Sequence, residues 1–288
     1  MSRQFLRDTQ NSDGGWPYFS GKHSWLEPTI YAALALNGES AGERAFAFVR
    51  SCALAEGGWR MSADVGMANW TTALCITLYL VKGVQDDAFR NGVHWMLNTI
   101  GAEGSFLGRM ANLLHPEQVD IDASLQGWPW RPDNASWVEP TAHALVALKK
   151  IEKHGGTVSN RLSLRARVEV GEKMLIDRRC GDGGWNYGNK RVWNTPLPSY
   201  PETTALALLG LQGRPATELK PSLDAAARWI RETRSPLAKA WLGISLRNWG
   251  LPVETAEVDQ SEDILLSALQ ALAEPGGGHQ LLSPAGNV

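Results

Sequence analysis

The sequence lacks any long apolar run. No stretch of its 288 residues approaches the roughly 20 consecutive apolar residues of a membrane-spanning helix. The first residues, MSRQFLRDTQNSDGG, also lack the apolar core of a signal peptide. Cysteine is scarce, and Cys52, Cys75 and Cys180 are far apart in the sequence, which suits buried thiols in a reducing compartment better than disulfides. We therefore expect a cytoplasmic protein.

A strong charge of one sign is missing as well. The formal net charge is -2, with acidic and basic residues mixed along the chain. Proteins that bind nucleic acid through its phosphates need a basic surface. We therefore expect no nucleic-acid partner.

What the sequence does contain is a recurring pattern: an aromatic residue, any residue, Glu, Pro or Thr, then Thr, followed by small and apolar residues. The copies are SWVEPTAHALVAL (136–148), SWLEPTIYAALAL (24–36), SYPETTALALLGL (199–211) and the weaker ANWTTALCITLYL (68–80). The weak copy keeps Trp70 and, in this alignment, has Asn69 where the others have glutamate. Proline in the first turn and glutamate near it are typical of a helix N-terminus. The apolar run that follows predicts an inner helix buried on all sides.

A second pattern precedes these helix starts. The tetrapeptides DGGW (13–16), EGGW (56–59) and DGGW (182–185) are close copies, and EGSF (103–106) resembles an eroded one. Before them lie segments with apolar residues at helical spacing, at 5–9, 43–54, 88–100 and 165–179. Glycine after such a segment is typical of a helix end and a tight turn. The sequence therefore predicts half-exposed outer helices, each joined by a turn to an inner helix.

With both patterns, residues 3–250 resemble the squalene cyclase and protein prenyltransferase repeat superfamily. The resemblance implies an all-α fold, an α/α toroid of about six helical hairpins in two layers around a central cavity. We expect about eleven helices, with the sixth hairpin incomplete. Residues 1–274 would form a single toroid domain, 101–136 an inserted loop over the cavity mouth, and 275–288 a flexible C-terminal tail.

Three glutamates at helix starts are the candidate acids: Glu27, Glu139 and Glu202. One interpretation is structural, because a carboxylate near a helix N-terminus compensates the helix dipole. The other is functional: in a toroid these starts converge on one mouth, where buried carboxyl groups under aromatic walls have raised pKa values and can donate protons. His143 follows Glu139 by four residues, on the same helix face, and completes the catalytic candidates. The candidate substrate-binding residues are Trp25, Tyr31, Asn69, Trp70, Asp122, Trp130, Trp137 and Tyr200.

The resemblance implies a terpene cyclase-like isomerase, which protonates an isoprenoid in an aromatic-lined cavity. The sequence departs from that branch, since the Asp-x-Asp-Asp motif is absent and Asp120-Ile121-Asp122-Ala123 is the nearest string. The Asp-x-Cys string of the zinc-dependent prenyltransferases and the Cys-Gly-Glu-Gln of the thioester branch are also missing. We expect no metal and no cofactor, and an apolar isoprenoid-like ligand with peripheral membrane contact as an open possibility. Two alternatives remain open: a non-catalytic toroid that binds an isoprenoid or a peptide, and a carbohydrate-active α/α barrel.

Overall fold

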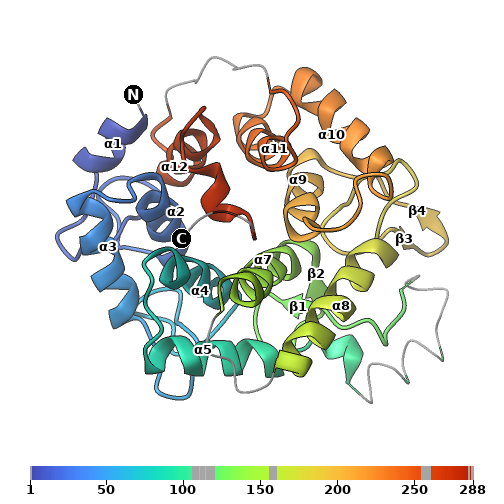
Figure 1. Cartoon of the computed structure of the whole chain (residues 1–288), viewed down its shortest axis with the longest axis horizontal. Coiled ribbons are helices and arrows are strands. Elements are labelled where there is room, and N and C mark those ends of the chain that lie inside the picture. Colours follow the sequence, from blue (N-terminus) through green and yellow to red (C-terminus); the bar gives the residue numbers. More distant parts are fainter. Residues whose placement is uncertain are drawn as a thin grey trace.

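Six helices form a closed inner ring in the computed structural model, which describes residues 2–105, 110, 114, 121–155, 161–253, 261–284 and 286. They are α2 (Leu26–Ala35), α4 (Thr71–Val81), α7 (Val138–His154), α9 (Pro201–Gly210), α11 (Pro236–Asn248) and α12 (Ile264–Ala273). Each packs against the next in chain order, and α12 packs against α2, which closes the ring (Figure 1). The predicted α/α toroid is therefore confirmed.

In the described part of the chain, five outer helices cover this ring (Figure 1). They are α1 (Ser2–Asp8), α3 (Ser40–Ser51), α5 (Asp87–Asn98), α8 (Arg161–Asp177) and α10 (Lys220–Glu232). The shorter elements are η1 (Ala102–Gly104), β1 (Trp128–Pro129), β2 (Ser136–Trp137), β3 (Arg191–Val192), β4 (Thr195–Pro196) and η2 (His279–Leu282). Within the described part of the chain, no helix is both long enough and apolar enough to cross a membrane.

The inner helices are rich in small residues, and they pack against other helices on both sides. In α2 every residue from Pro28 to Ala35 is buried, whereas α3 alternates buried and exposed positions. A close approach explains one glycine of α9: a Cβ atom on Gly210 would lie 2.8 Å from the Cα atom of Ala142 in α7. Small side chains thus allow the ring helices to approach one another closely.

The tryptophan of each turn joins an outer helix to an inner one. The backbone N–H of Trp16 donates to the Thr29 hydroxyl (2.7 Å), and its indole N–H donates to the carbonyl of Leu6 (2.8 Å). Trp185 repeats both contacts, to the Thr204 hydroxyl (2.9 Å) and to the carbonyl of Leu175. These side chains are fully buried, so their repetition serves the packing of the hairpins.

The third hairpin turn lies elsewhere than predicted. Trp128 donates its N–H to the Thr141 hydroxyl (2.9 Å), with the same thirteen-residue separation as Trp16 and Thr29. The turn of this repeat is therefore Gln126-Gly127-Trp128, and the assignment to 103–106 was wrong. The insertion consequently ends before the turn, while β1 and β2 belong to the repeat itself. Most of 106–120 lies outside the described residues.

The same threonine contact corrects the register of α4. The N–H of Trp59 donates to the Thr72 hydroxyl (3.1 Å), which places Thr72 level with Thr29, Thr141 and Thr204. The glutamate lies two residues before this threonine in the other copies. Trp70, and not Asn69, therefore occupies the glutamate position in α4. Tryptophan thus replaces the acid in this helix.

The C-terminal segment packs against the ring, contrary to the prediction of a flexible tail. Leu281 and Leu282 of η2 are buried, and the Lys150 ammonium donates to the carbonyls of Ser283 (2.8 Å) and Gly286 (3.2 Å). The side chain of Asn248 donates to the carbonyl of His279 (3.0 Å). Two buried leucines and polar contacts from α7 and α11 explain the difference, because glycine content alone does not show what a segment packs against.

Candidate active site

The N-termini of the inner helices gather at one end of the ring, which we call the mouth. Each of the first five inner helices follows an outer helix in the chain. The outer helices return the chain, so that these inner helices all begin at the same end of the ring. The start of α12 joins the same end, because the N–H of Ile264 donates to the carbonyl of Tyr18 (2.9 Å) beside α2. Glu27, Glu139 and Glu202 all lie in the first turns of inner helices, so all three of these carboxyl groups lie at the mouth.

Glu27 is half-buried beside a tyrosine and an aspartate. The Tyr18 hydroxyl donates a short hydrogen bond to its carboxyl group. Burial raises the pKa of Glu27, the Tyr18 hydrogen bond opposes that rise, and the charge of Asp263 adds to it. Asp263 also accepts from the N–H of Leu266 (3.0 Å) and caps α12. Two acidic groups from neighbouring helices therefore share this side of the mouth.

The pKa of the Glu139 carboxyl group is strongly perturbed. Burial and the charge of Glu27 together raise its pKa to about 8. A carboxyl group with this pKa holds its proton at neutral pH. Glu139 is therefore a neutral acid at the mouth of the ring.

His143 lies one turn below Glu139 and is neutral too. Burial lowers its pKa to about 3. Its Nε2 atom is 3.2 Å from the Tyr31 hydroxyl and 4.0 Å from the Glu139 carboxyl group. The second distance is too long for a hydrogen bond, so the pair is a contact between neutral groups and not a salt bridge.

Three aromatic side chains meet across the ring beneath the carboxyl groups. The ring centroids of Tyr31 and Trp241 are 5.5 Å apart, those of His143 and Trp241 5.9 Å, and those of Tyr31 and His143 6.3 Å. Their helices, α2, α7 and α11, are alternate members of the inner ring. All three residues are buried and form a floor under the mouth.

Two further tryptophans extend this aromatic lining. Trp70 lies 5.5 Å from the His143 ring, centroid to centroid, and 4.9 Å from Trp130 in an edge-to-face arrangement. The N–H of Trp70 donates to the carbonyl of Trp130 (3.1 Å), which fixes the two backbones together. The structure therefore brings Trp70, Trp130, Tyr31 and His143 together, with Glu139 beside His143.

Glu202 lies on the opposite side of the mouth from Glu27. The hydroxyl of Ser235, the N-cap residue of α11, donates to its carboxyl group (3.2 Å). Nearby, an open cleft of about 240 Å³ is lined by Trp137, Tyr187 and Tyr200. Trp25 lies at the rim instead, with its ring 6.1 Å from that of Tyr18.

Two predicted substrate-binding residues have other positions. The Asn69 side chain accepts from the N–H (3.0 Å) and the hydroxyl (2.9 Å) of Thr71, and it is buried, so its oxygen is used within the protein just before α4. Asp122 is exposed in the outer layer, where its N–H donates to Asp177 (3.2 Å) at the end of α8.

Sequence reasoning missed Tyr18, Trp241 and Asp263. Trp241 occupies the position of His143 and Tyr31 in its own helix, four residues after the place of the glutamate. Finding it required the register of α11, whose start has neither a Gly-Gly-Trp turn nor a glutamate. Tyr18 and Asp263 lie in loops without a repeat pattern.

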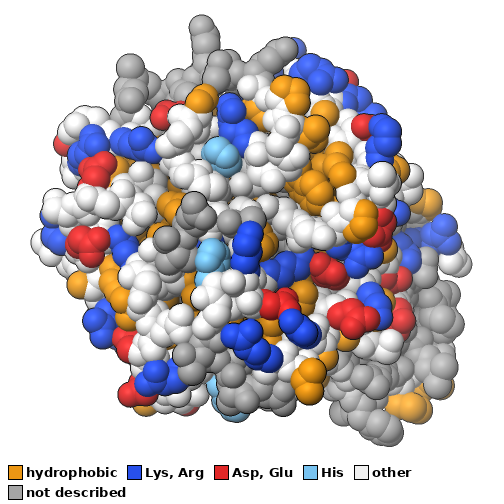
Figure 2. Space-filling model, in the orientation of Figure 1, with side chains coloured by type: hydrophobic (Ala, Val, Ile, Leu, Met, Phe, Trp, Pro, Cys, Tyr) orange, Lys and Arg blue, Asp and Glu red, His pale blue; other side chains and the backbone are white. Residues whose placement is uncertain are grey.

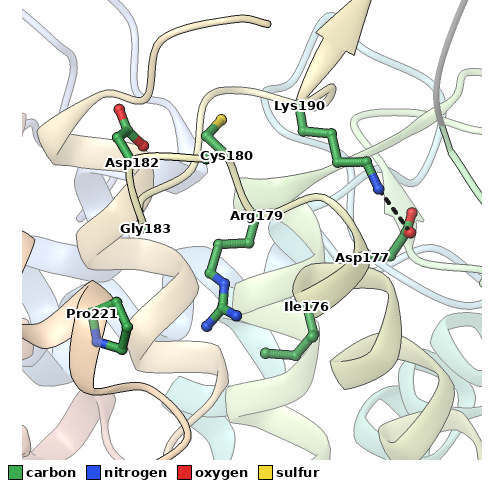
Figure 3. A pocket seen from close by; sticks show the side chains of 9 residues that line it. Ile176, Asp177, Arg179, Cys180, Asp182, Gly183, Lys190 and Pro221 are labelled. Carbon is green, nitrogen blue, oxygen red and sulfur yellow. Dashed lines mark hydrogen bonds and ion pairs between the residues drawn. The ribbon is translucent and has the colours of Figure 1, made fainter.

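A second cavity, of about 560 Å³, lies in the outer layer between the end of α8 and the start of α10 (Figure 3). Lys190 and Asp177 form an ion pair (3.2 Å) at one side of it. Burial raises the pKa of the Cys180 thiol, which therefore stays protonated and poorly nucleophilic at neutral pH. The ion pair and the protonated thiol give this cavity no reactive group, so the mouth is the stronger candidate for an active site.

Comparison with known proteins supports the fold alone. No protein-family model matches the sequence, and no curated protein matches it. The chain is similar to a variant of the type II terpene cyclase MstE from Scytonema in complex with geranylgeranyl dihydroxybenzoate, at a TM-score of 0.54 and 17% identity over 96% of this chain and 78% of that one. A protein from Actinoplanes gives a TM-score of 0.54 at 19% identity, over 96% and 80% of the two chains. A glycosidase variant gives 0.53 at 11% identity, over 96% and 83%. The chain thus has the helical toroid fold that the terpene cyclase and the glycosidase share.

Proposed function

We propose that the protein is a terpene cyclase-like isomerase that starts its reaction by proton transfer from Glu139. The observation that carries this proposal is the Glu139 carboxyl group beside His143, above a floor of buried aromatic rings, where burial raises its pKa to about 8. Protonation of an alkene needs an acid that holds a proton at working pH and a site that stabilises the resulting cation. Aromatic faces attract cations, and both requirements are met at this mouth.

The step balances without a cofactor. The O–H bond of Glu139 breaks, and a C–H bond forms at one alkene carbon, which leaves a carbocation at the other. The carbocation and the new carboxylate stabilise each other because they form an ion pair in a site with little water. Further alkenes attack the cation to close rings, and loss of a proton to a base ends the reaction. Substrate and product are isomers.

The residues around Glu139 would position it, keep it protonated and stabilise the cation. Tyr31 holds the His143 ring through its hydroxyl, and His143 lies against Glu139 and positions it. The charge of Glu27 contributes to the raised pKa of Glu139, so it helps to keep the acid loaded. Trp70, Trp130 and Trp241 present aromatic faces to the developing cation. The ligand is accordingly an apolar isoprenoid.

The test is product formation from linear isoprenoids. Purified protein is incubated with a panel of prenyl alcohols, prenylated phenols and prenyl diphosphates, and extracts are analysed by mass spectrometry. An isomer of the substrate should form with the natural protein and not with Glu139→Gln. Glu169→Gln, on the exposed side of α8, is the matched control and should remain active. Binding without product would support the non-catalytic toroid, and hydrolysis of a glycan panel would support the carbohydrate-active alternative.

Peripheral membrane contact is part of the proposal because apolar ligands partition into membranes. The loops that precede the inner helices expose Phe19 (53%), Met67 (49%) and Trp193 (64%). Such side chains can enter the surface of a bilayer. Co-sedimentation with neutral lipid vesicles tests this contact, and Trp193→Ser combined with Phe19→Ser should reduce it. Unchanged sedimentation of the double variant would contradict it.

A further inference from the structure

One layer of the inner ring alternates between large ring-bearing side chains and leucine. In α2, α7, α9, α11 and α12 this layer is the sixth residue after the N-cap residue, and in α4 it is the second residue after Thr72. In ring order, its members are Tyr31, Leu74, His143, Leu206, Trp241 and Leu269. The three residues of the floor therefore come from every second helix, and a buried leucine occupies each position between them.

Exposure to solvent ends at the floor. In α7 the Glu139 side chain is 19% exposed, whereas that of His143, one turn deeper, is 5% exposed. The floor rings are between 5.5 and 6.3 Å apart, centroid to centroid, which are distances at which aromatic rings are in contact. One turn below them, Ala35, Ala147 and Ser245 are buried as well. A ligand that enters the mouth therefore stops at the floor.

The C-terminal segment closes the opposite end of the ring. Its helix η2 packs against both α4 and α11, which stand opposite each other in the ring, so the segment crosses the opening (Figure 1). The Ser283 hydroxyl donates to the side chain of Gln212 after α9 (2.7 Å), and Lys150 of α7 donates to the Ser283 carbonyl (2.8 Å). The described residues thus close the ring below the floor and leave it accessible from the mouth.

The depth of the mouth limits the length of a bound chain. Trp25 and Trp137 at the rim are the N-cap residues of their helices, and the floor residues Tyr31 and His143 follow them by six positions. At a rise of about 1.5 Å per residue, the rim and the floor are about 9 Å apart. An extended isoprene unit spans four carbon–carbon bonds of about 1.5 Å each, or roughly 5 Å along the chain. About two isoprene units therefore fit between the rim and the floor.

We propose that Tyr31, His143 and Trp241 restrict the substrate to a short prenyl chain of about two isoprene units, and that any further units stay outside the ring. The inference rests on the proposed function, because it takes the ligand to be an isoprenoid. It names the substrate class as monoterpenoid-sized, with room for a single ring closure above the floor. The floor residues then determine chain-length specificity, while Glu139 supplies the proton.

Calorimetric titration of the full-length Glu139→Gln variant with prenol, geraniol and farnesol tests the inference. The three alcohols contain one, two and three isoprene units, and each unit that becomes buried should raise the affinity about tenfold or more. We therefore expect geraniol to bind at least about tenfold more tightly than prenol, and farnesol to bind within about threefold of geraniol. A further tenfold gain from geraniol to farnesol would overturn the inference alone, because it would show a deeper site.

Removal of one floor ring should deepen the site. In the Glu139→Gln background, Trp241→Ala should make farnesol bind at least about fivefold more tightly than geraniol, because the space of the indole becomes available to the third unit. Trp241→Leu should cause a smaller change in the same direction. This second variant should fold, since leucine already occupies the layer in three of the six helices.

Trp229→Ala, on the outer helix α10, is the matched control and should leave the ratio of the farnesol and geraniol affinities unchanged. The inference fails if neither Trp241 variant changes this ratio, or if the control changes it equally. Absence of binding by all three alcohols would overturn the proposed function together with the inference. The expected chain-length pattern without any product in the natural protein would keep the inference and overturn the cyclisation.

Discussion

The two ends of the ring treat buried charge in different ways. At the mouth, the Glu27 carboxyl group meets the Tyr18 hydroxyl and that of Glu139 lies near a neutral imidazole. Toward the other end, Glu172 is paired with Lys149 and with Arg214 (3.0 Å), while Lys150 donates to the carbonyls of the C-terminal segment. On the face shown in Figure 2, acidic and basic side chains are interspersed.

Whether a buried charged group has a partner of opposite charge decides its protonation state. A buried charge with an opposite partner stays ionised because the partner offsets its desolvation, and removing that partner destabilises the fold. A buried carboxyl group whose burial is not offset by a cation becomes a neutral acid, which costs stability and provides a proton donor. Under the proposed function, the mouth therefore gives up stability for a proton donor.

Loss of the mouth acid should have the largest effect. Glu139→Gln keeps the shape and removes the transferable proton, so product formation should fall by about 10² to 10⁴-fold, the usual contribution of a general acid. Product quantification by mass spectrometry measures it. The variant should fold at least as well as the natural protein, and full activity would show that another group is the acid.

Breaking a paired charge should affect stability instead. Glu103 is buried in an ion pair with Arg178 (2.9 Å) between the insertion and the end of α8. Glu103→Ala leaves the guanidinium buried without its partner, so we expect a loss of about 3 to 5 kcal/mol in the free energy of unfolding. Urea denaturation measures it, and Glu169→Ala, which removes an exposed partner of Lys173, should cause no measurable change. Similar losses in both variants would contradict the distinction.

Removal of residues 275–288 tests the end opposite the mouth. The truncation exposes the surface that buries Leu281 and Leu282 and removes the carbonyl partners of Lys150. We expect the unfolding free energy to fall by about 3 kcal/mol, from the burial of two leucines less the cost of ordering the segment. Thermal denaturation measures it. The affinity of the mouth for isoprenoids should remain, and its loss would show that the two ends are not independent.

The pH dependence of stability should reveal the neutral acid. The folded chain keeps the Glu139 proton up to a pKa of about 8, whereas an unfolded carboxyl group loses it near pH 4.5. Unfolding therefore releases a proton between these values, and rising pH favours the unfolded chain. The stability advantage of Glu139→Gln should grow from pH 5 to pH 8 by on the order of 3 kcal/mol.

His143 has the opposite sign. Its pKa is about 3 in the folded chain and 6.5 in the unfolded one, so acidification below pH 6.5 favours unfolding. The neutral pair is therefore most stable between about pH 4.5 and pH 6.5. Thermal unfolding of the natural protein and of Glu139→Gln from pH 4.5 to pH 6.5 tests the opposite pH dependences of stability that Glu139 and His143 cause. A difference between the two proteins that does not vary with pH would show that Glu139 is ionised in the fold.

The sequence by itself determined the repeat, and therefore most of the fold. Small apolar runs after proline or threonine predict buried helices, and glycine and tryptophan between helices predict the hairpin turns, because these are local requirements. The glutamates at helix starts and the histidine after Glu139 follow from the same local pattern. A repeated pattern also predicts that equivalent residues gather at one end.

Tertiary structure decided the register, the partners and the protonation states. The hydrogen bond from the N–H of Trp128 to the Thr141 hydroxyl identifies Trp128 as the third turn. The hydrogen bond from the N–H of Trp59 to the Thr72 hydroxyl likewise shows that Trp70 stands at the glutamate position. Trp241 joins Tyr31 and His143 only because α11 alternates with α2 and α7 around the ring. Burial then decides that Glu139 is neutral, since the desolvation of a carboxyl group depends on everything that packs around it and not on its neighbours in sequence.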